Sequence, residues 1–271
     1  ETFNYLKKQF SNDSRVIILR NKLNHGKRHA LSQAIFMMKS SFTALMDSDT
    51  VMEKDTLSHL VARMTDDIQV VTANIQAMNR DENWLSRLID ARYRNAFLIE
   101  RAAQSVMKSV ICATGVLSLY RTDFLKDVAP EWKAQTFFGK PVQFGDDRRL
   151  TAYSLQRGGA VISLEAVAAT KVPTQPWQFL KQQIRWNKSF LRESVLCIRD
   201  FGVTRWPGFF SFVEISFWLF YLITIAKVLF LHSTVGFFTL GFVWLAYVFA
   251  SGIFRNISLI VREPRLLFLV P

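Results

Sequence analysis

The chain is poor in cysteine, and it lacks internal repeats and low-complexity linkers. Two cysteines among 271 residues exclude a disulfide scaffold, and a reducing compartment is their natural setting. Half of the residues are hydrophobic and 14% are aromatic. Global disorder is therefore excluded, because disordered chains are poor in such residues. The length allows one large or two small domains.

Charge is scarce near the C-terminus. Residues 207–271 contain four Lys or Arg and two acids, but half of the 24 Phe. Residues 208–231 carry two ionisable groups and residues 235–254 carry none, and each run is long enough to cross a hydrocarbon core of about 30 Å. The sequence therefore predicts two transmembrane helices, joined by residues 232–234 into an antiparallel hairpin. A buried helical hairpin of a soluble protein is the alternative.

Basic residues flank the ends of these two runs that lie away from the 232–234 link. They are Arg199, Arg205, Arg255, Arg262 and Arg265. The positive-inside rule then predicts a cytoplasmic N-terminal part. Glu214 lies about two turns inside the first run, where a carboxylate is unfavourable unless it is protonated or paired. Lys227 is on nearly the opposite helix face, so we expect a partner for Glu214 from elsewhere, such as further helices.

The first 206 residues are basic and alternate between apolar runs and helical patterns. They carry about +10 of the net charge of +12, which by itself points to nucleic acid or to an anionic membrane surface. Strands are predicted at residues 15–19, 42–46, 70–77 and 160–164, and residues 110–120 are predicted as a strand pair or as one strand interrupted at Thr114-Gly115. Helices are predicted at 27–39, 54–65, 84–108, 150–157 and 177–200. This alternation favours an α/β fold with a mostly parallel sheet, in which ligands bind at the carboxyl ends of strands.

Two acidic motifs are candidates for chemistry. Asp47 and Asp49 follow the predicted strand 42–46, and two carboxylates one residue apart can hold a hard divalent cation together with nucleotide phosphates. A polar loop or a helix N-cap is the alternative. Asp146 and Asp147 precede the predicted helix 150–157. Either they stabilise its N-terminus, or one of them is a general base that deprotonates an alcohol.

Two basic motifs complete the set. Gln182, Arg185 and Trp186 share one side of the predicted helix 177–200, where the guanidinium can grip phosphate and the indole can carry a sugar. A basic amphipathic helix on lipid headgroups is a compatible alternative. Lys27 and Arg28 lie near the start of a predicted helix and suit a phosphate or uracil contact, unless they belong to a solvated turn.

The order and spacing of these motifs resemble the processive family 2 glycosyltransferases of polysaccharide synthases. D-S-D is followed after about a hundred residues by G-D-D-R-R-L, then after about 35 more by Q-x-x-R-W, and then by the membrane hairpin. QTFFGKPVQFGDDRRLT, LKQQIRWNKSFLRES, FVEISF and FRNISLIVREP look like class I hyaluronan synthases, whereas chitin synthases typically have G-E-D-R. The resemblance covers essentially the whole chain, and QQxRWNKS is its most specific element.

The resemblance implies a membrane-bound enzyme of the plasma membrane. It implies a cytoplasmic GT-A domain over residues 1–172, an interfacial helix region over 173–206 and a membrane part over 207–271. Such enzymes transfer GlcNAc and GlcA alternately from UDP-GlcNAc and UDP-GlcA, use Mg²⁺ or Mn²⁺, and export the growing hyaluronan chain. Membrane lipids are then partners and nucleic acid is not.

The resemblance also implies roles for individual residues. By motif match, Asp147 is the catalytic base, Asp49 is the metal ligand and Asp47 engages UDP. The other implied substrate-binding residues are Lys27, Arg28, Cys112, Asp146, Arg148, Gln182, Arg185 and Trp186. The family's S-G-P-L-S-x-Y-R motif reads here as residues 114–121, with Val116 in place of the proline, so the acceptor-facing loop departs from the pattern.

Two family segments are not found in the sequence. The strand with V-x-D-D-G-S is expected before Glu1 and the W-G-T-R segment after Pro271, so we expect a fragment that is inactive by itself. One alternative is a synthase of a chitin-like or other β-linked polysaccharide from a UDP-sugar. Another is a non-catalytic basic membrane protein.

Overall fold

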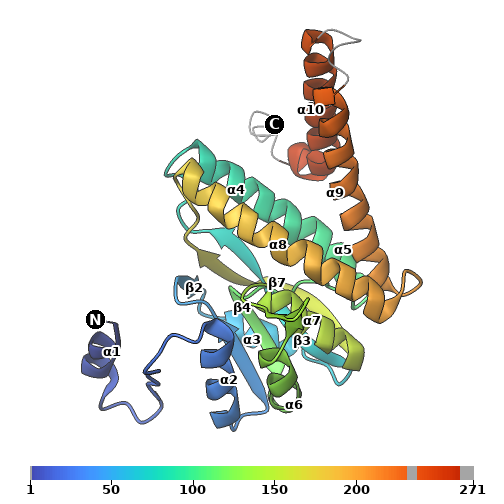
Figure 1. Cartoon of the computed structure of the whole chain (residues 1–271). Coiled ribbons are helices and arrows are strands. Elements are labelled where there is room, and N and C mark those ends of the chain that lie inside the picture. Colours follow the sequence, from blue (N-terminus) through green and yellow to red (C-terminus); the bar gives the residue numbers. More distant parts are fainter. Residues whose placement is uncertain (1, 231–236, 263–271) are drawn as a thin grey trace.

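A five-stranded mixed sheet forms the centre of the computed structural model, which describes residues 2–230 and 237–262 (Figure 1). The strand order is β1 (Phe42–Met46), β4 (Leu117–Arg121), β3 (Ile68–Ala77), β7 (Gly159–Thr170) and β2 (Thr50–Met52). Only β3 and β7 pair in parallel within this described sheet, and the other pairs are antiparallel. The prediction of a mostly parallel sheet is therefore wrong.

The physical reason lies in residues 110–120, where the sequence predicts a strand pair or a strand interrupted at Thr114-Gly115. The start of this segment runs parallel to β7 through the Ser109–Ala160 bridge, whereas β4 runs antiparallel to β3. The chain therefore reverses between these two points, at the Thr114-Gly115 interruption. Ser118 Oγ donates to the Thr114 carbonyl at 2.7 Å, and the Thr114 N–H donates to Thr72 Oγ1 at 3.1 Å. These two hydrogen bonds fix the reversal.

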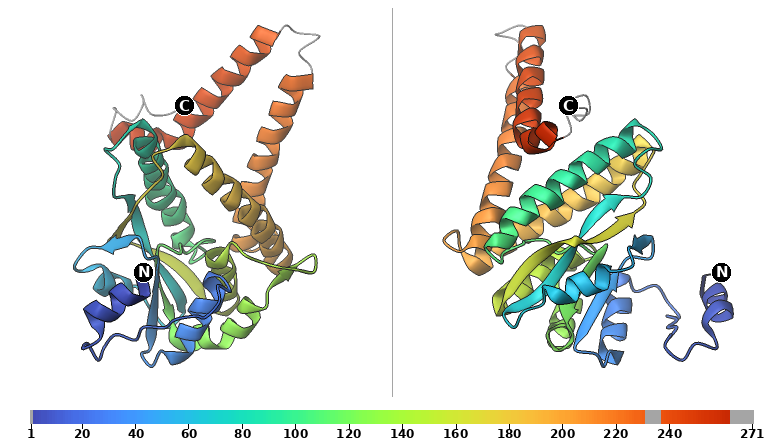
Figure 2. Two further views of the ribbon diagram at one scale, coloured as in Figure 1. Left: turned by 60° about the vertical axis from the view of Figure 1, so that its left-hand side comes forward. Right: turned by 180° about the vertical axis from the view of Figure 1, so that it is seen from behind.

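Helices cover both faces of the sheet (Figures 1 and 2). The helices of the described chain are α1 Thr2–Phe10, α2 Lys27–Met37, α3 Thr56–Ala62, α4 Trp84–Asn95, the π-helix η1 Ala96–Arg101, α5 Ala102–Val106, α6 Thr122–Lys133, α7 Asp146–Arg157, α8 Pro176–Phe201, α9 Trp206–Phe230 and α10 Phe237–Arg262, of which α1, α9 and α10 lie away from the sheet. A small hairpin of β5 (Thr136–Phe137) and β6 (Lys140–Pro141) connects α6 to α7. The predicted helix 84–108 is thus one helical segment with a π-helical turn inside it.

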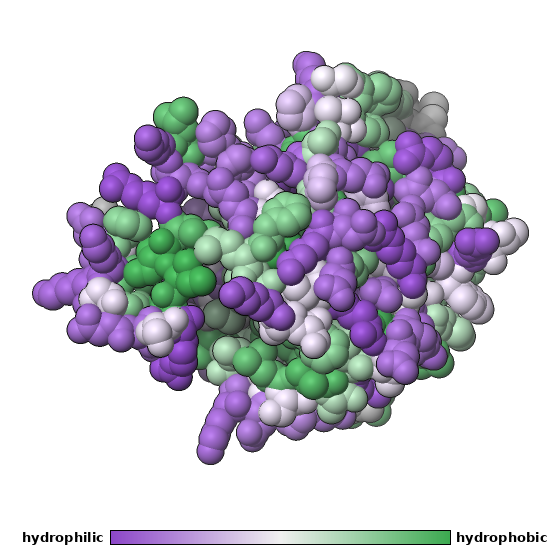
Figure 3. All heavy atoms as spheres, turned by 90° about the horizontal axis from the view of Figure 1, so that it is seen from below, coloured by the Kyte–Doolittle hydropathy of each residue, from purple (hydrophilic) through white to green (hydrophobic). Residues whose placement is uncertain are grey.

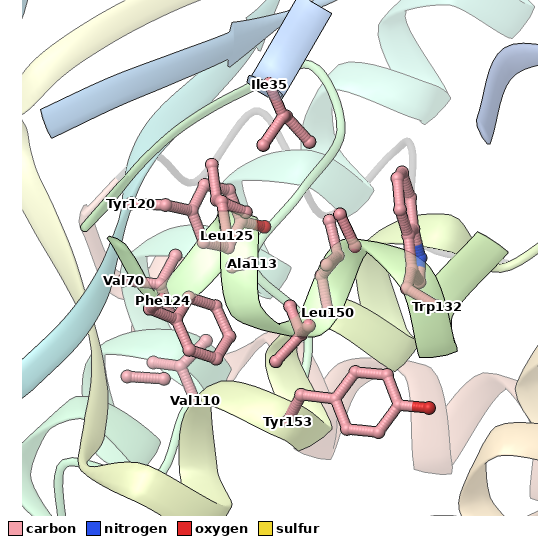
Figure 4. Close-up of a cluster of buried hydrophobic side chains, with 13 residues drawn as sticks. Ile35, Val70, Val110, Ala113, Tyr120, Phe124, Leu125, Trp132, Leu150 and Tyr153 are labelled. Carbon is pink, nitrogen blue, oxygen red and sulfur yellow. The ribbon is translucent and has the colours of Figure 1, made fainter. Parts of the chain in front are cut away.

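Two apolar clusters fill the space between the sheet and these helices. Side chains alternate across a strand, so the neighbours Val70 and Val71 of β3 belong to different clusters. The Val70 cluster joins the sheet to α2, α6 and α7, and Figure 4 shows Trp132 of α6 and Leu150 of α7 within it. The Val71 cluster joins the sheet to α3 and η1. The start of α7 is therefore positioned by a buried core.

Three local predictions differ from the structure. Residues 15–19 form no strand, and Ile17 is 61% exposed, because no described strand pairs with this β-branched run. Asp49 does not cap a helix, since β2 begins at Thr50. Asp146 and Asp147 do not precede their helix but occupy its first turn.

The membrane part is supported for one span. Within the described residues, Trp206–Lys227 of α9 is the one segment long and apolar enough to cross a membrane, and it is almost entirely unburied. Most of the second predicted run lies in α10, which contacts α9, while the 232–234 link lies outside the described residues. The hairpin stays a prediction. The opposite end of the molecule has a largely hydrophilic surface (Figure 3).

Candidate active site

Three motifs that are far apart in the sequence meet at Gly115. A Cβ atom built there would lie 3.3 Å from Lys27 Nζ, 3.8 Å from Asp47 Oδ2 and 3.9 Å from Asp147 Cβ. Lys27 is the first residue of α2, Asp47 directly follows β1, and Asp147 lies in the first turn of α7. Because Gly115 has no side chain, these three charged side chains can lie close together around it.

The D-S-D turn leaves its second carboxylate accessible. The Asp47 N–H donates to the Val116 carbonyl at 3.1 Å, and the Asp47 carboxylate forms an ion pair with Lys27. Asp49 is exposed, and no ion pair to it is found in the described ranges. Its negative charge reaches Tyr93 of α4, whose pKa is raised to about 12, first by burial and then by Asp49. Asp49 is thus available to a ligand.

A divalent cation fits this turn only together with other ligands. Residues 2–230 and 237–262 contain no group of three or more His, Cys, Asp or Glu arranged to hold a metal ion. Mg²⁺ is commonly bound by one or two carboxylates and completed by water and substrate phosphates. Asp47 and Asp49 match that smaller donor set, with Asp49 the less engaged of the two.

Asp147 is held at the positive end of α7. One carboxylate oxygen accepts the Arg148 N–H at 2.8 Å, and the other lies 3.7 Å from the Cys112 thiol, which can donate to it. The N-cap of the helix is Gly145, whose φ of 86° and whose contacts exclude a side chain, because a Cβ would lie 2.8 Å from the Ser189 Cβ of α8. A carboxylate in this place can act as a general base.

Arg28 and Asp146 face each other rather than open solvent. Arg28 is buried, forms an ion pair with Asp146, and donates to the Trp132 carbonyl at 3.0 Å and to Gln135 Oε1 at 2.6 Å. Burial raises the pKa of Asp146, and the charge of Arg28 opposes that rise. The pair holds α2 and α6 against the start of α7, beside the cluster at Gly115.

The three residues of the Q-x-x-R-W motif lie on α8. Arg185 and Trp186 are exposed, and Gln182 is partly buried with its Oε1 atom lacking a hydrogen-bond donor. None of the three supplies one of the three atoms nearest to the Cβ position of Gly115. Ser189, one turn further along α8, is the residue that meets Gly145. The motif therefore lies on the part of α8 that leads up to the start of α7.

Arg148 bonds to the membrane-spanning helix. Its Nη2 atom lies 3.1 Å from Glu214 Oε2 of α9, its Nη1 atom lies 3.4 Å from Ser194 Oγ, and its guanidinium lies 5.0 Å from the Phe190 ring centroid. Burial opposes the charged guanidinium, but the charge and hydrogen bond of Glu214, together with the neighbouring Cys112 and Asp147, raise the pKa of Arg148. The partner of Glu214 therefore comes from elsewhere than Lys227, as expected, but it belongs to α7 and not to further helices.

The Cys112 thiol is expected to react slowly with iodoacetamide. Burial, and then the charge of Asp147, raise its pKa from an ordinary 9.0 to about 11. At pH 8 this leaves about a hundredfold less thiolate than in an unfolded chain, and the thiolate is the reactive form. Mass spectrometry of timed labelling of native and urea-unfolded protein measures the ratio. Equal rates in the two states would contradict the buried, protonated thiol.

Comparison with known proteins identifies the family. The family described as glycosyltransferase-like family 2 matches residues 1–189. The chain belongs to this glycosyltransferase family. It is 35% identical over 257 residues to hyaluronan synthase from Streptococcus pyogenes, and this covers 94% of the chain and 61% of that relative. It is 37% identical over 195 residues to an N-acetylglucosaminyltransferase from Azorhizobium caulinodans, covering 70% of the chain and 49% of the relative.

A solved glycosyltransferase structure supports the fold. A mannosyltransferase from Pyrobaculum calidifontis, solved with GDP-Man and Mn²⁺, has a TM-score of 0.52, 17% identity, and covers 72% of this chain and 51% of its own. At this identity the likeness concerns the fold alone, so the GT-A-like architecture is shared. The chain spans about three fifths of the hyaluronan synthase that it matches.

Sequence reasoning missed several residues that hold the glycosyltransferase site together. Gln135 bonds to Arg28, and Glu193 of α8 bonds to Arg149 of α7 at 2.8 Å. A signal for Glu193 was present, because it is spaced four residues from Ser189 and from Cys197 on the buried side of α8. An acid on the inward face of a basic amphipathic helix needs a buried partner.

Proposed function

We propose that the protein is a membrane-bound processive glycosyltransferase that polymerises UDP-GlcNAc and UDP-GlcA into hyaluronan and exports the polymer. The observation that carries the proposal is the meeting of Lys27, Asp47 and Asp147 around Gly115. It brings a cation for a diphosphate and a carboxylate for an acceptor hydroxyl into one place. The 35% identity to hyaluronan synthase over nearly the whole chain supports the choice of substrates.

In this proposal the residues at Gly115 divide the work of an inverting transfer. Asp147 accepts the proton of the acceptor hydroxyl while that oxygen attacks the anomeric carbon, and the bond between that carbon and UDP breaks with inversion. Lys27 offers positive charge to the leaving diphosphate. Asp47 orients Lys27 through their ion pair and engages UDP. Arg28 and Asp146, already paired with each other, hold the site rather than contact the sugar.

Asp49 is the proposed protein ligand for Mg²⁺ or Mn²⁺. Such an ion, when bound, neutralises charge on the leaving diphosphate. Asp49 suits this role because it is exposed, follows β1 by a short turn and carries no ion pair within the described structure. Further along the chain, Gln182, Arg185 and Trp186 are proposed to border the acceptor and diphosphate subsite from α8.

The proposed location is the plasma membrane, with the catalytic part in the cytoplasm. Residues 1–172 form the proposed GT-A unit, residues 173–206 an interfacial helix and residues 207–271 the membrane part. The apolar, unburied span Trp206–Lys227 supports the membrane assignment. The exposed Trp177, Leu180 and Ile184 of α8, with Lys181 and Arg185 among them, suit a helix at the headgroup boundary.

A chitin-like synthase is the second candidate. The 37% identity to an N-acetylglucosaminyltransferase, over 70% of the chain, favours it. The two candidates differ in whether GlcA is needed. The 35% identity to hyaluronan synthase extends over 94% of the chain, so that candidate is preferred.

The product assay separates the two candidates. Membranes carrying the natural gene product are incubated with radiolabelled UDP-GlcNAc and UDP-GlcA, together and singly, and the polymer is treated with a hyaluronan-specific lyase. We expect polymer only when both sugars are present, and we expect complete digestion. Lyase-resistant polymer from UDP-GlcNAc alone would favour the chitin-like candidate, and no incorporation under any condition would contradict both.

A further inference from the structure

Arg148 connects the polar domain to the membrane-spanning helix. It belongs to the first turn of α7, next to Asp147, and its guanidinium reaches Glu214 on α9. α9 contains the span Trp206–Lys227, which is apolar enough to cross a membrane. The Arg148–Glu214 ion pair therefore joins the proposed catalytic helix directly to the membrane-spanning helix.

The surroundings of Arg148 leave it little freedom to do anything else. The side chains of Arg148 and Glu214 are 17% and 31% exposed, and the guanidinium also contacts Ser194 Oγ and the face of Phe190 on α8. One side chain thus ties α7 to both α8 and α9. A guanidinium held on three sides by protein groups has few donors left for a substrate phosphate.

The backbone of the same residue contacts Asp147. The Arg148 N–H donates to Asp147 Oδ1 at 2.8 Å, so a shift of residue 148 moves the carboxylate of Asp147, whose Cβ lies close to Gly115. Loss of Glu214 would leave the Arg148 guanidinium charged and poorly solvated, and it would pull the first turn of α7 towards water or another acid. Small displacements of a catalytic group reduce the rate more than they reduce binding.

We propose that Arg148 and Glu214 are positioning residues that set the place of Asp147 relative to the membrane-spanning helix, and that Arg148 is not a substrate-binding residue. The inference rests on the proposed function for the role of Asp147. It explains why an acid lies inside an apolar span. Glu214 serves as the counter-ion of a guanidinium from the polar domain.

The test uses the natural gene product in membranes, with the variants Glu214→Gln, Arg148→Glu and Glu214→Arg, and the double variant Arg148→Glu with Glu214→Arg. Lys227→Gln, which removes a charge at the other end of α9, is the matched control. We expect Glu214→Gln to lower kcat about tenfold or more with KM for both UDP-sugars within about twofold, because the misplaced base slows chemistry and not binding. We expect the double variant to recover activity above either single charge reversal, and the control to match the wild type.

Other outcomes would overturn the inference. A raised KM in Arg148→Glu together with wild-type kinetics in Glu214→Gln would mean that Arg148 binds substrate. Absence of recovery in the double variant would mean that the pair is not coupled. A readout independent of activity is thermal unfolding in detergent, measured for the wild type, Arg148→Glu, Glu214→Arg and the double variant as a double-mutant cycle. If the two substitutions have non-additive effects on unfolding but the wild type makes no polymer, the ion pair is real and the proposed function is wrong. If their effects on unfolding are additive, the ion pair itself does not contribute and the inference is wrong.

Discussion

Asp147→Asn is expected to lower kcat by about a thousandfold while the protein stays folded, because a general base contributes about 10² to 10⁴ in rate. Asparagine has nearly the same shape and can still accept the Arg148 N–H with its amide oxygen. It cannot take up a proton from the acceptor hydroxyl. KM for the UDP-sugars is expected to change little, because Asp147 acts on the acceptor side. Initial rates of sugar incorporation, at saturating and at limiting UDP-sugar, measure both quantities.

The control for this variant is Asp127→Asn. Asp127 is an exposed acid of α6 that pairs with Arg157 at 2.5 Å, and it is not one of the residues nearest to Gly115. Its rate is expected to equal that of the wild type. If Asp147→Asn kept more than about a tenth of the wild-type kcat, the loss would be smaller than removal of a general base causes, and Asp147 would not be that base. The non-catalytic alternative, a basic membrane protein, predicts no loss at all.

Short-range patterns in the sequence predicted individual elements well. Residues 42–46 form β1 with the predicted bounds, and the predicted helix 177–200 is α8, Pro176–Phe201. Both depend on local periodicity, which a sequence displays directly. By contrast, α6 was not predicted, and it carries Pro130 in its interior, a residue that usually ends a helix. The buried Trp132 and Leu125 of α6 show that core packing outweighs this local preference.

The direction of β4 could not be read from its own residues. An apolar strand pattern is the same whether the neighbouring strand is parallel or antiparallel. Here a turn at Thr114-Gly115 makes β4 antiparallel to β3. The same holds for the candidate site. The motifs identified Lys27, Asp47 and Asp147 individually as candidates. That they lie together at Gly115 depends on how α2, β1 and α7 are placed in the fold. The ion pair of Arg148 with Glu214 spans 66 residues and leaves no periodic trace.

The contact between α7 and α8 is expected to be the least tolerant of change in the described structure. Arg149 and Glu193 form a 2.8 Å ion pair with side chains that are 4% and 3% exposed. Glu193 also accepts from Arg192 at 2.7 Å and from Gln135 at 3.1 Å, while Arg149 reaches Asp200 at 3.2 Å. The acid therefore compensates two guanidinium groups in a region without solvent.

Glu193→Ala is expected to lower the free energy of unfolding by about 3 to 5 kcal/mol, since it leaves a buried guanidinium without its closest counter-ion. Arg199→Ala is the control on the same helix. Arg199 is 68% exposed and pairs with Asp200 at 2.7 Å, so its removal is expected to change stability by less than about 1 kcal/mol. Thermal unfolding of the purified protein in detergent measures both values. Similar small losses in the two variants would show that Asp200 alone suffices for Arg149, and that α7 is held against α8 by its apolar contacts.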